Sequence, residues 1–151
     1  MRRTHLIAIA VAIVVFLLIS ALLARVFSAN SAEQSAITTL VTDEAHGDTG
    51  AVIGDITGCR STPACRQRAS ENVRALAHPG PVSIIQIQPS TSFSIAGTRG
   101  FARVAWSVGG SLPIVQCVRV WRTGNAISGL HVELHQVSRR IGSESACPAH
   151  F

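Results

Sequence analysis

An uninterrupted apolar stretch lies near the N-terminus of the chain. Residues 6–24, LIAIAVAIVVFLLISALLA, carry no charge, and Ser20 is their only polar side chain. At about 1.5 Å per residue, a helix of this length crosses the ~30 Å hydrocarbon core of a bilayer. The pattern predicts a membrane-spanning helix over residues 6–26, preceded by a short cytoplasmic segment, residues 1–5.

A cleaved signal peptide is the alternative interpretation of this stretch. Arg2 and Arg3 precede it, and a small-x-small cleavage site lies at residues 29–31. The apolar part of a signal peptide is usually shorter, about 7–15 residues, which favours a retained anchor in the cell membrane over a secreted protein. Basic residues are more numerous before the span than after it, where Arg25 stands alone, and this predicts that the remainder lies outside the cytoplasm.

A helical pattern follows the span. Residues 27–32 are interpreted as a linker, and the spacing of Asn30 to Glu33, or of Ser31 to Gln34, predicts a new helix start. Gly47 and Gly50 predict a break in this helix. Apolar residues then recur with helical spacing at Ile37, Leu40, Val41, Ala45, Val52, Ile53 and Ile56.

The segment STPACRQRASENVRALAHPG predicts a second helix. Thr62 is the expected N-cap, Pro63 occupies the first turn, His78 the last turn, and Pro79 with Gly80 ends the helix.

From Pro81 onward the apolar period changes from 3.6 to 2, which is typical of strands. The connections PST, AGTRG, GGSL and TGNA are short, so consecutive strands are expected to pair as antiparallel hairpins. The fold class is therefore α+β, with a transmembrane helix followed by two helices packed on a curled four- to five-stranded antiparallel sheet over residues 33–140. The predicted strands are 82–88, 92–95, 101–108, 113–122 and 127–137.

This element order, behind one membrane span, resembles the nuclear transport factor 2-like and cystatin-like superfold. In particular it is similar to the single-span ectodomains of several cell-envelope and secretion assemblies. The resemblance extends from Glu33 to about Val137 and rests on element order alone. The resemblance assigns no function and no functional residue, because one fold serves many functions. An interaction or assembly module of the cell envelope is instead predicted from the membrane span, the cysteine pattern and the missing catalytic motifs.

The four cysteines all lie beyond the apolar stretch, and their even number indicates an oxidising compartment. Proximity predicts that Cys59 pairs with Cys65 and Cys117 with Cys147, one of three possible pairings. The second bond is expected to tether the tail, residues 141–151. A redox pair or a metal site at Cys59 and Cys65 is the alternative.

Several reaction classes lack their motifs. The letters DEAH occur in TDEAHGD, but a chain without lysine cannot form the GxxxxGK phosphate loop of a nucleotide hydrolase. Asp43 and Glu44 are expected on a solvated helix face, with His46 as a remaining acid–base or metal candidate. No GxSxG or SxxK motif is present, which predicts a protein that is not an enzyme and needs no cofactor or metal.

Basic residues also fail to form a nucleic-acid signature, because they occur without a run and without interleaved aromatics. Beyond Arg25 the chain has ten arginines and eight carboxylates. The predicted partners are therefore the lipid bilayer and another envelope protein or a second copy, not nucleic acid.

The stretch HVELH places His131, Glu133 and His135 on one face of the last strand. The two histidines lie about 13 Å apart along a strand, too far to bind one metal ion. Glu133 is expected to pair with an arginine across the strands. The predicted interaction face is the polar side of the sheet at Arg103, Arg119, His131 and Glu133. The competing hypothesis is a pocket for a small or lipid-like ligand, or a hydrolytic one, with His46, Asp43 or Glu44 as its polar group.

Overall fold

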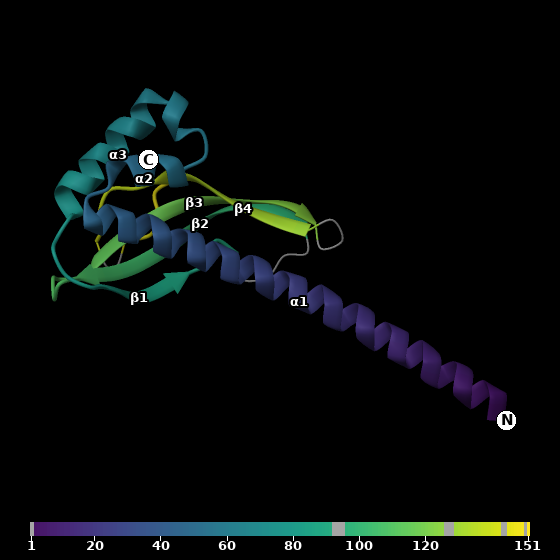
Figure 1. The fold of residues 1–151 in the computed structure, drawn as a ribbon. Helices are drawn as coiled ribbons and strands as arrows, with labels where there is room; N and C mark the ends of the chain where they lie inside the picture. The colour runs from purple at the N-terminus through teal and green to yellow at the C-terminus, as the bar shows by residue number, and fades with distance from the viewer. Residues whose placement is uncertain (1, 92–95, 126–128, 143–144, 150) are drawn as a thin grey trace.

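The computed structural model describes residues 2–91, 96–125, 129–142, 145–149 and 151. The helical part comprises α1 (Arg2–His46), α2 (Thr49–Asp55), the short 3-10 helix η1 (Cys59–Ser61) and α3 (Pro63–Leu76). Four strands follow: β1 (Val82–Gln88), β2 (Ala96–Val108), β3 (Ile114–Asn125) and β4 (Gly129–Val137). The predicted α+β class with an antiparallel sheet is confirmed (Figure 1). The expected strand at 92–95 lies outside the described residues.

Helix α1 runs without interruption from the apolar stretch into the folded domain. The prediction of a linker at 27–32 and of a new helix start at Asn30 or Ser31 is therefore wrong. The side chains expected to cap a helix bind the sheet instead: Asn30 Oδ1 accepts a hydrogen bond from Arg122, and so does the carboxylate of Glu33. Because Asn30 and Glu33 bind the sheet and do not cap a new helix, α1 continues through this segment.

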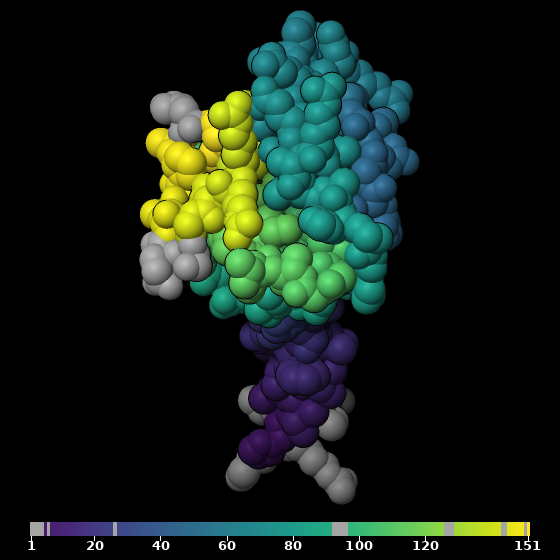
Figure 2. Space-filling view, turned by 90° about the vertical axis from the view of Figure 1, so that its left-hand side faces the viewer, coloured from purple at the N-terminus to yellow at the C-terminus, as the bar shows by residue number. Residues whose placement is uncertain are grey.

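The N-terminal half of α1 projects away from the rest of the protein (Figures 1 and 2). Its apolar side chains are exposed, Phe16 to 68%. Within the described residues, α1 is the one helix long and apolar enough to cross a membrane.

The breaks between the helices follow the predicted glycine and proline signals. Helix α1 ends at His46, and Gly47 adopts a φ of +84°, a left-handed conformation that favours glycine. Asp48 then caps α2 by accepting a hydrogen bond from Ala51 N at 2.9 Å. Thr62 precedes α3 as expected, but α3 ends at Leu76, so His78 lies beyond it.

The sheet is a meander in the order β1-β2-β3-β4. Strand β2 starts earlier than predicted, since the segment AGTRG is part of the strand and not a turn. Its glycines allow close backbone approach: a Cβ atom on Gly100 would lie 2.5 Å from the carbonyl oxygen of Ser90. Gly100 thus allows the backbone of another segment to pack closely against β2. From the sequence pattern alone, a glycine with this role cannot be distinguished from a glycine in a turn.

Each edge of the sheet is irregular or covered. In β1 the register shifts between Ile84 and Gln86, and the intervening Ile85 is 55% exposed. Along the outer edge of β4, the segment after α2 adds a parallel bridge between Ile56 and Leu134, where Thr57 N donates to Leu134 O at 2.7 Å.

The core lies between α1 and one face of the sheet, with α2 and α3 packed beside α1. The predicted helical stripe is confirmed on α1 and α2, and the alternating positions of β2 are confirmed on the sheet. The largest apolar side chains that are fully buried are Ile37, Leu40, Val41, Val52, Val104, Trp106, Val108, Val118 and Val120.

Two disulfides complete the fold, with the predicted pairing. Cys59 bonds to Cys65 and joins η1 to α3, while Cys117 bonds to Cys147 and holds the tail on β3.

Candidate functional site

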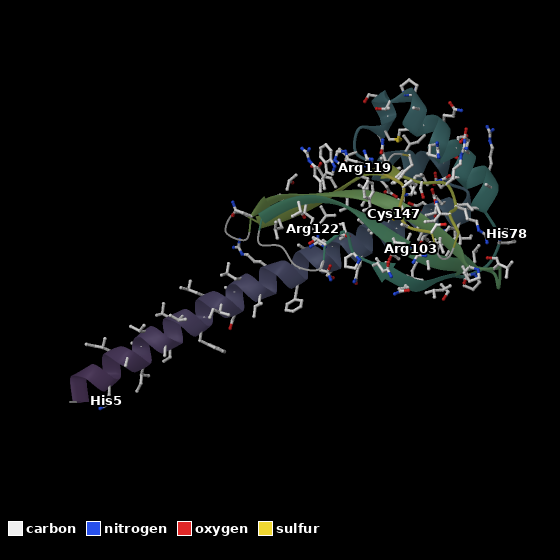
Figure 3. The ribbon with its side chains drawn as sticks, turned by 180° about the vertical axis from the view of Figure 1, so that it is seen from behind. His5, His78, Arg103, Arg119, Arg122 and Cys147 are labelled. Carbon is white, nitrogen blue, oxygen red and sulfur yellow. A yellow bond between two sulfur atoms is a disulfide. The ribbon has the colours of Figure 1, made fainter. Side chains whose placement is uncertain are left out.

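The face of the sheet that points away from α1, here called the outer face, carries most of the candidate chemistry. Alternation along the strands separates its side chains from those of the core. Figure 3 shows Arg119 on this side and Arg122 between the sheet and α1. Described side chains on the outer face include Arg99, Phe101 and Arg103 on β2, Arg119 and Trp121 on β3, and His131, Glu133 and His135 on β4.

Trp121 is the centre of a stacked group on this face. The imidazole of His135 stacks on it with ring centroids 3.7 Å apart, and the guanidinium of Arg99 lies 4.1 Å from the Trp121 ring centroid. Arg99 and Glu133 are the register partners of Trp121 on the two neighbouring strands. A cation above an indole ring is attracted by its quadrupole, so the stack holds Arg99 in place.

Arg119 is held by the C-terminal tail. Its guanidinium lies 5.1 Å from the Phe101 ring and 5.6 Å from the Phe151 ring, and it donates a hydrogen bond to Ala149 O at 3.0 Å. The tail reaches this position because Cys147 is bonded to β3. Arg119 is therefore half-buried and pre-positioned.

The expected ion pair between Glu133 and an arginine is wrong. Glu133 Oε2 instead lies 3.1 Å from Nε2 of His135. The position opposite Glu133 on β3 is occupied by Trp121, so no arginine faces it there. His131 is exposed, and His135 stacks on Trp121. No group of three or more His, Cys, Asp or Glu side chains within the described residues is arranged to hold a metal ion.

A pocket of about 340 Å³ opens where β4 meets η1 and α3. Its polar lining includes Arg68, Arg119, His135 and Gln136, and its apolar walls include Trp121 and Phe151, beside the Cys59–Cys65 disulfide. None of the described residues that line it is Asp or Glu. Arg68 Nε is buried without a hydrogen-bond partner and lies 3.8 Å from Glu71 Oε2. The pocket therefore offers positive charge and an unused donor.

The prediction that Glu44 lies on a solvated helix face is wrong, because Glu44 is fully buried. Asn72 Nδ2 donates to one carboxylate oxygen at 2.9 Å and Gln116 Nε2 to the other at 2.8 Å. Gln116 Oε1 accepts from Trp106 Nε1 at 2.9 Å, which fixes the orientation of its amide. Both amides also donate to the Ser138 carbonyl. Burial raises the pKa of Glu44 to about 7, although these two hydrogen bonds oppose the shift.

A second buried carboxylate, Glu33, lies nearer the apolar half of α1. Glu33 Oε2 accepts from Arg122 Nε at 2.7 Å and lies 2.6 Å from Arg122 Nη2. Ser90 donates to both oxygens through its backbone N–H and its hydroxyl, at 2.7 and 2.8 Å. We call Glu33, Arg122, Ser90 and Asn30 the membrane-side clamp, because together they fix α1 to the sheet.

Three other acidic side chains interact around α2: Asp43 near the end of α1, Asp48 at the N-cap of α2 and Asp55 at its last residue. Partial burial, a hydrogen bond with Asp43 and the charges of Asp43 and Asp48 raise the pKa of Asp55 to about 6. His46 is exposed, and none of Asp43, Glu44 and His46 lines the pocket described above. The competing hypothesis of a ligand pocket with one of these residues as its polar group is therefore not supported by the pocket beside the outer face.

The acidic group gives a direct titration test. In the Asp43→Asn variant, Asp55 is expected to titrate at a lower pH than in the original chain, because one negative neighbour is removed. NMR titration of the Asp55 side chain measures this shift. Asp48→Asn, which removes the weaker charge effect, should lower the pKa of Asp55 less. An equal or larger effect of Asp48→Asn contradicts the assignment.

Comparison of the chain with protein-family models, with curated proteins and with solved structures finds no match. The interpretation of the outer face therefore rests on its own geometry.

Proposed function

We propose that this protein is a membrane-anchored module that presents its domain outside the cytoplasm and binds an acidic partner protein through the outer face. The proposed anchoring and placement outside the cytoplasm rest on two features. One helix is apolar enough to cross a membrane, and the two disulfides are typical of an oxidising compartment. We also infer a nuclear transport factor 2-like or cystatin-like relationship, on element order alone. The proposed role is assembly, without catalysis.

The pocket beside the outer face is the observation that carries the partner assignment. Arg68 and Arg119 line it, and none of its described lining residues is Asp or Glu. Among its described residues, the outer face adds Arg99 and Arg103 against the carboxylate of Glu133. Guanidinium groups bind carboxylates through charge-assisted hydrogen bonds, so an Asp or Glu side chain of the partner fits this pocket.

Trp121 and Phe151 supply apolar area beside these charges. Tryptophan and arginine are frequent among the residues that dominate the binding energy of protein interfaces. Their arrangement is pre-formed, because Trp121 is stacked with His135 and Arg119 is fixed by the tail. Less side-chain entropy is therefore lost when a partner binds.

The test is the recovery of complexes formed by the full-length protein in its own membranes, by mild detergent extraction and native mass spectrometry. Arg68→Ala and Arg119→Ala are each expected to weaken the complex about tenfold or more, since a hydrogen bond to a charged group contributes about 1.5–3 kcal/mol. Arg103→Ala, His131→Ala and Glu133→Ala test the rest of the predicted face. A homo-oligomer in the spectrum identifies the partner as a second copy.

Arg74→Ala is the matched control, because Arg74 is exposed on α3 and does not line the pocket. It should leave both the complex and the melting temperature unchanged. A complex that survives the substitutions at Arg68, Arg103, Arg119, His131 and Glu133 contradicts the assignment of the partner to this face.

A small anionic ligand is the second candidate occupant, favoured by the volume of about 340 Å³. In that case the native spectrum shows a monomer with a small added mass, and this mass is lost in Arg68→Ala. A secreted form requires cleavage near residues 29–31, which removes Asn30 and its contact with Arg122 from the membrane-side clamp.

A further inference from the structure

Helix α1 and strand β3 lie side by side and run in opposite directions. Two contacts define this alignment: Glu44 of α1 binds Gln116, and Glu33 of α1 binds Arg122. From Gln116 to Arg122 the strand advances about 20 Å, and from Glu33 to Glu44 the helix advances about 17 Å. The two lengths agree, so β3 runs nearly parallel to the axis of α1 and toward its apolar half.

This alignment places the β3–β4 end of the sheet at a definite height along α1. Asn125 lies about 10 Å beyond Arg122 along the strand, which equals about seven residues of helix. Arg122 is level with Asn30 and Glu33, so Asn125 is level with about residues 23–26 of α1. The apolar stretch ends at residue 24, and Arg25 is the first charged residue after it. Figure 1 shows this end of the sheet directed toward the apolar half of α1.

We infer that the β3–β4 end of the sheet rests in the lipid headgroup layer of the membrane that α1 crosses, so that the domain is docked on the bilayer surface in one orientation. The inference rests on the membrane anchoring proposed above. A headgroup layer is about 5–7 Å thick on each side of the hydrocarbon core, which covers the height of Asn125 and approaches that of Thr123.

The continuous helix and the membrane-side clamp make this docking rigid. A linker at 27–32 would let the domain swing away from the bilayer, but the structure has helix there. A typical helix tilt of about 20° moves a point about 10 Å from the helix axis by only about 3 Å along the membrane normal. Asn125 therefore stays near the headgroup layer over the usual range of tilts.

The side chains at this end suit contact with headgroups. Thr123, Asn125 and His131 are exposed and polar, and Leu130 is a half-buried apolar residue next to them. Among the described residues of this end beyond the row of Arg99, Trp121 and Glu133 (25–32, 96–98, 122–125 and 129–132), no carboxylate occurs that lipid phosphates would repel. Glu33, which is level with Arg122, is buried in the membrane-side clamp. Headgroup phosphates are the expected hydrogen-bonding partners of Thr123 and His131.

Depth-dependent quenching of tryptophan fluorescence tests the inference on the full-length protein in phosphatidylcholine vesicles with nitroxide on the headgroup. The background is Trp121→Phe, which leaves the fully buried Trp106. In it, Asn125→Trp is expected to be quenched several-fold more strongly than Leu112→Trp, with Thr123→Trp between the two. Leu112 is the matched control, because it is 77% exposed in the β2–β3 connection, at the opposite end of the sheet.

A fourth reporter separates this inference from the anchoring itself. Phe16→Trp should be quenched by nitroxide on the acyl chains if α1 crosses the bilayer. Strong quenching of Phe16→Trp together with equally weak quenching at positions 125, 123 and 112 overturns the docked orientation while leaving the anchor intact. No quenching of Phe16→Trp overturns the anchoring, and the docked orientation with it.

Discussion

Replacing Glu33 with alanine is expected to lower the free energy of unfolding by about 3–5 kcal/mol, because removing one partner of a buried ion pair leaves the other charge uncompensated. Glu33 and Arg122 are both buried, and their closest atoms lie 2.6 Å apart. The change also removes the acceptor for the backbone N–H and the hydroxyl of Ser90. Urea unfolding of the full chain in mild detergent, followed by tryptophan fluorescence, measures the loss.

A double variant separates the cost of an unpaired charge from the value of the pair. Glu33→Leu with Arg122→Met removes both charges and keeps apolar volume, and such replacements are often neutral or stabilising. It should therefore be more stable than Glu33→Ala. Gln34→Ala, at an exposed neighbour on the same helix, should change stability by less than about 0.5 kcal/mol. A double variant as unstable as the single one contradicts the ion-pair explanation.

The free energy of unfolding is expected to decrease by roughly 3 kcal/mol as the pH rises from 4.5 to about 7, because of Glu44. Its pKa in the folded protein lies above that of the unfolded chain. In this window the folded protein keeps a proton that the unfolded chain releases, so the contribution is fully present at low pH and is lost as the pH approaches 7. Urea unfolding at pH 5 and pH 8 measures the difference.

Glu44→Gln isolates this effect, because glutamine does not titrate. The variant should lose most of the difference between the two pH values. Asp55 acts in the same direction as Glu44 below pH 6, whereas Glu71 acts in the opposite direction, since the hydrogen bond from Arg139 lowers its pKa. The contribution of Glu71 is fully present above pH 4.5 and is lost only at lower pH, so Glu71→Gln should leave the difference between pH 5 and pH 8 unchanged. A Glu44→Gln variant with the same pH dependence as the original chain rules out Glu44 as its source.

Local patterns in the sequence were sufficient for much of the fold. The stripe of Ile37, Leu40 and Val41 follows helical spacing, and Thr62 with Pro63 marks the start of α3. These features depend on neighbours within a few residues, where spacing and backbone preference decide the structure. The disulfides followed from proximity along the predicted elements.

The buried polar groups could not be predicted in this way. Glu33 binds Arg122 and Glu44 binds Gln116, in each case across most of the domain sequence. A carboxylate at such a position resembles a solvated one until its partners are known, because its burial depends on them. The continuity of α1 was missed for the same reason, because the partners of Asn30 and Glu33 lie on the sheet, far away in the sequence.

The outer face was predicted in outline only. Arg119 and His131 were placed on the correct side by alternation, and the same alternation contained Trp121, which lies two residues after Arg119. The pocket was not predictable, because Arg68 of α3 and Phe151 of the tail join it only through the tertiary fold.

The irregular edges of the sheet have a consequence for the membrane-anchored protein proposed above, whose copies would be concentrated in one plane. An open, regular edge strand can pair with the edge of a neighbouring molecule and start an amyloid-like aggregate. Here the bulge at Ile85 interrupts the hydrogen-bonding pattern of β1, and Thr57 occupies part of the edge of β4. Neighbouring copies are therefore expected to stay crowded side by side without joining their sheets.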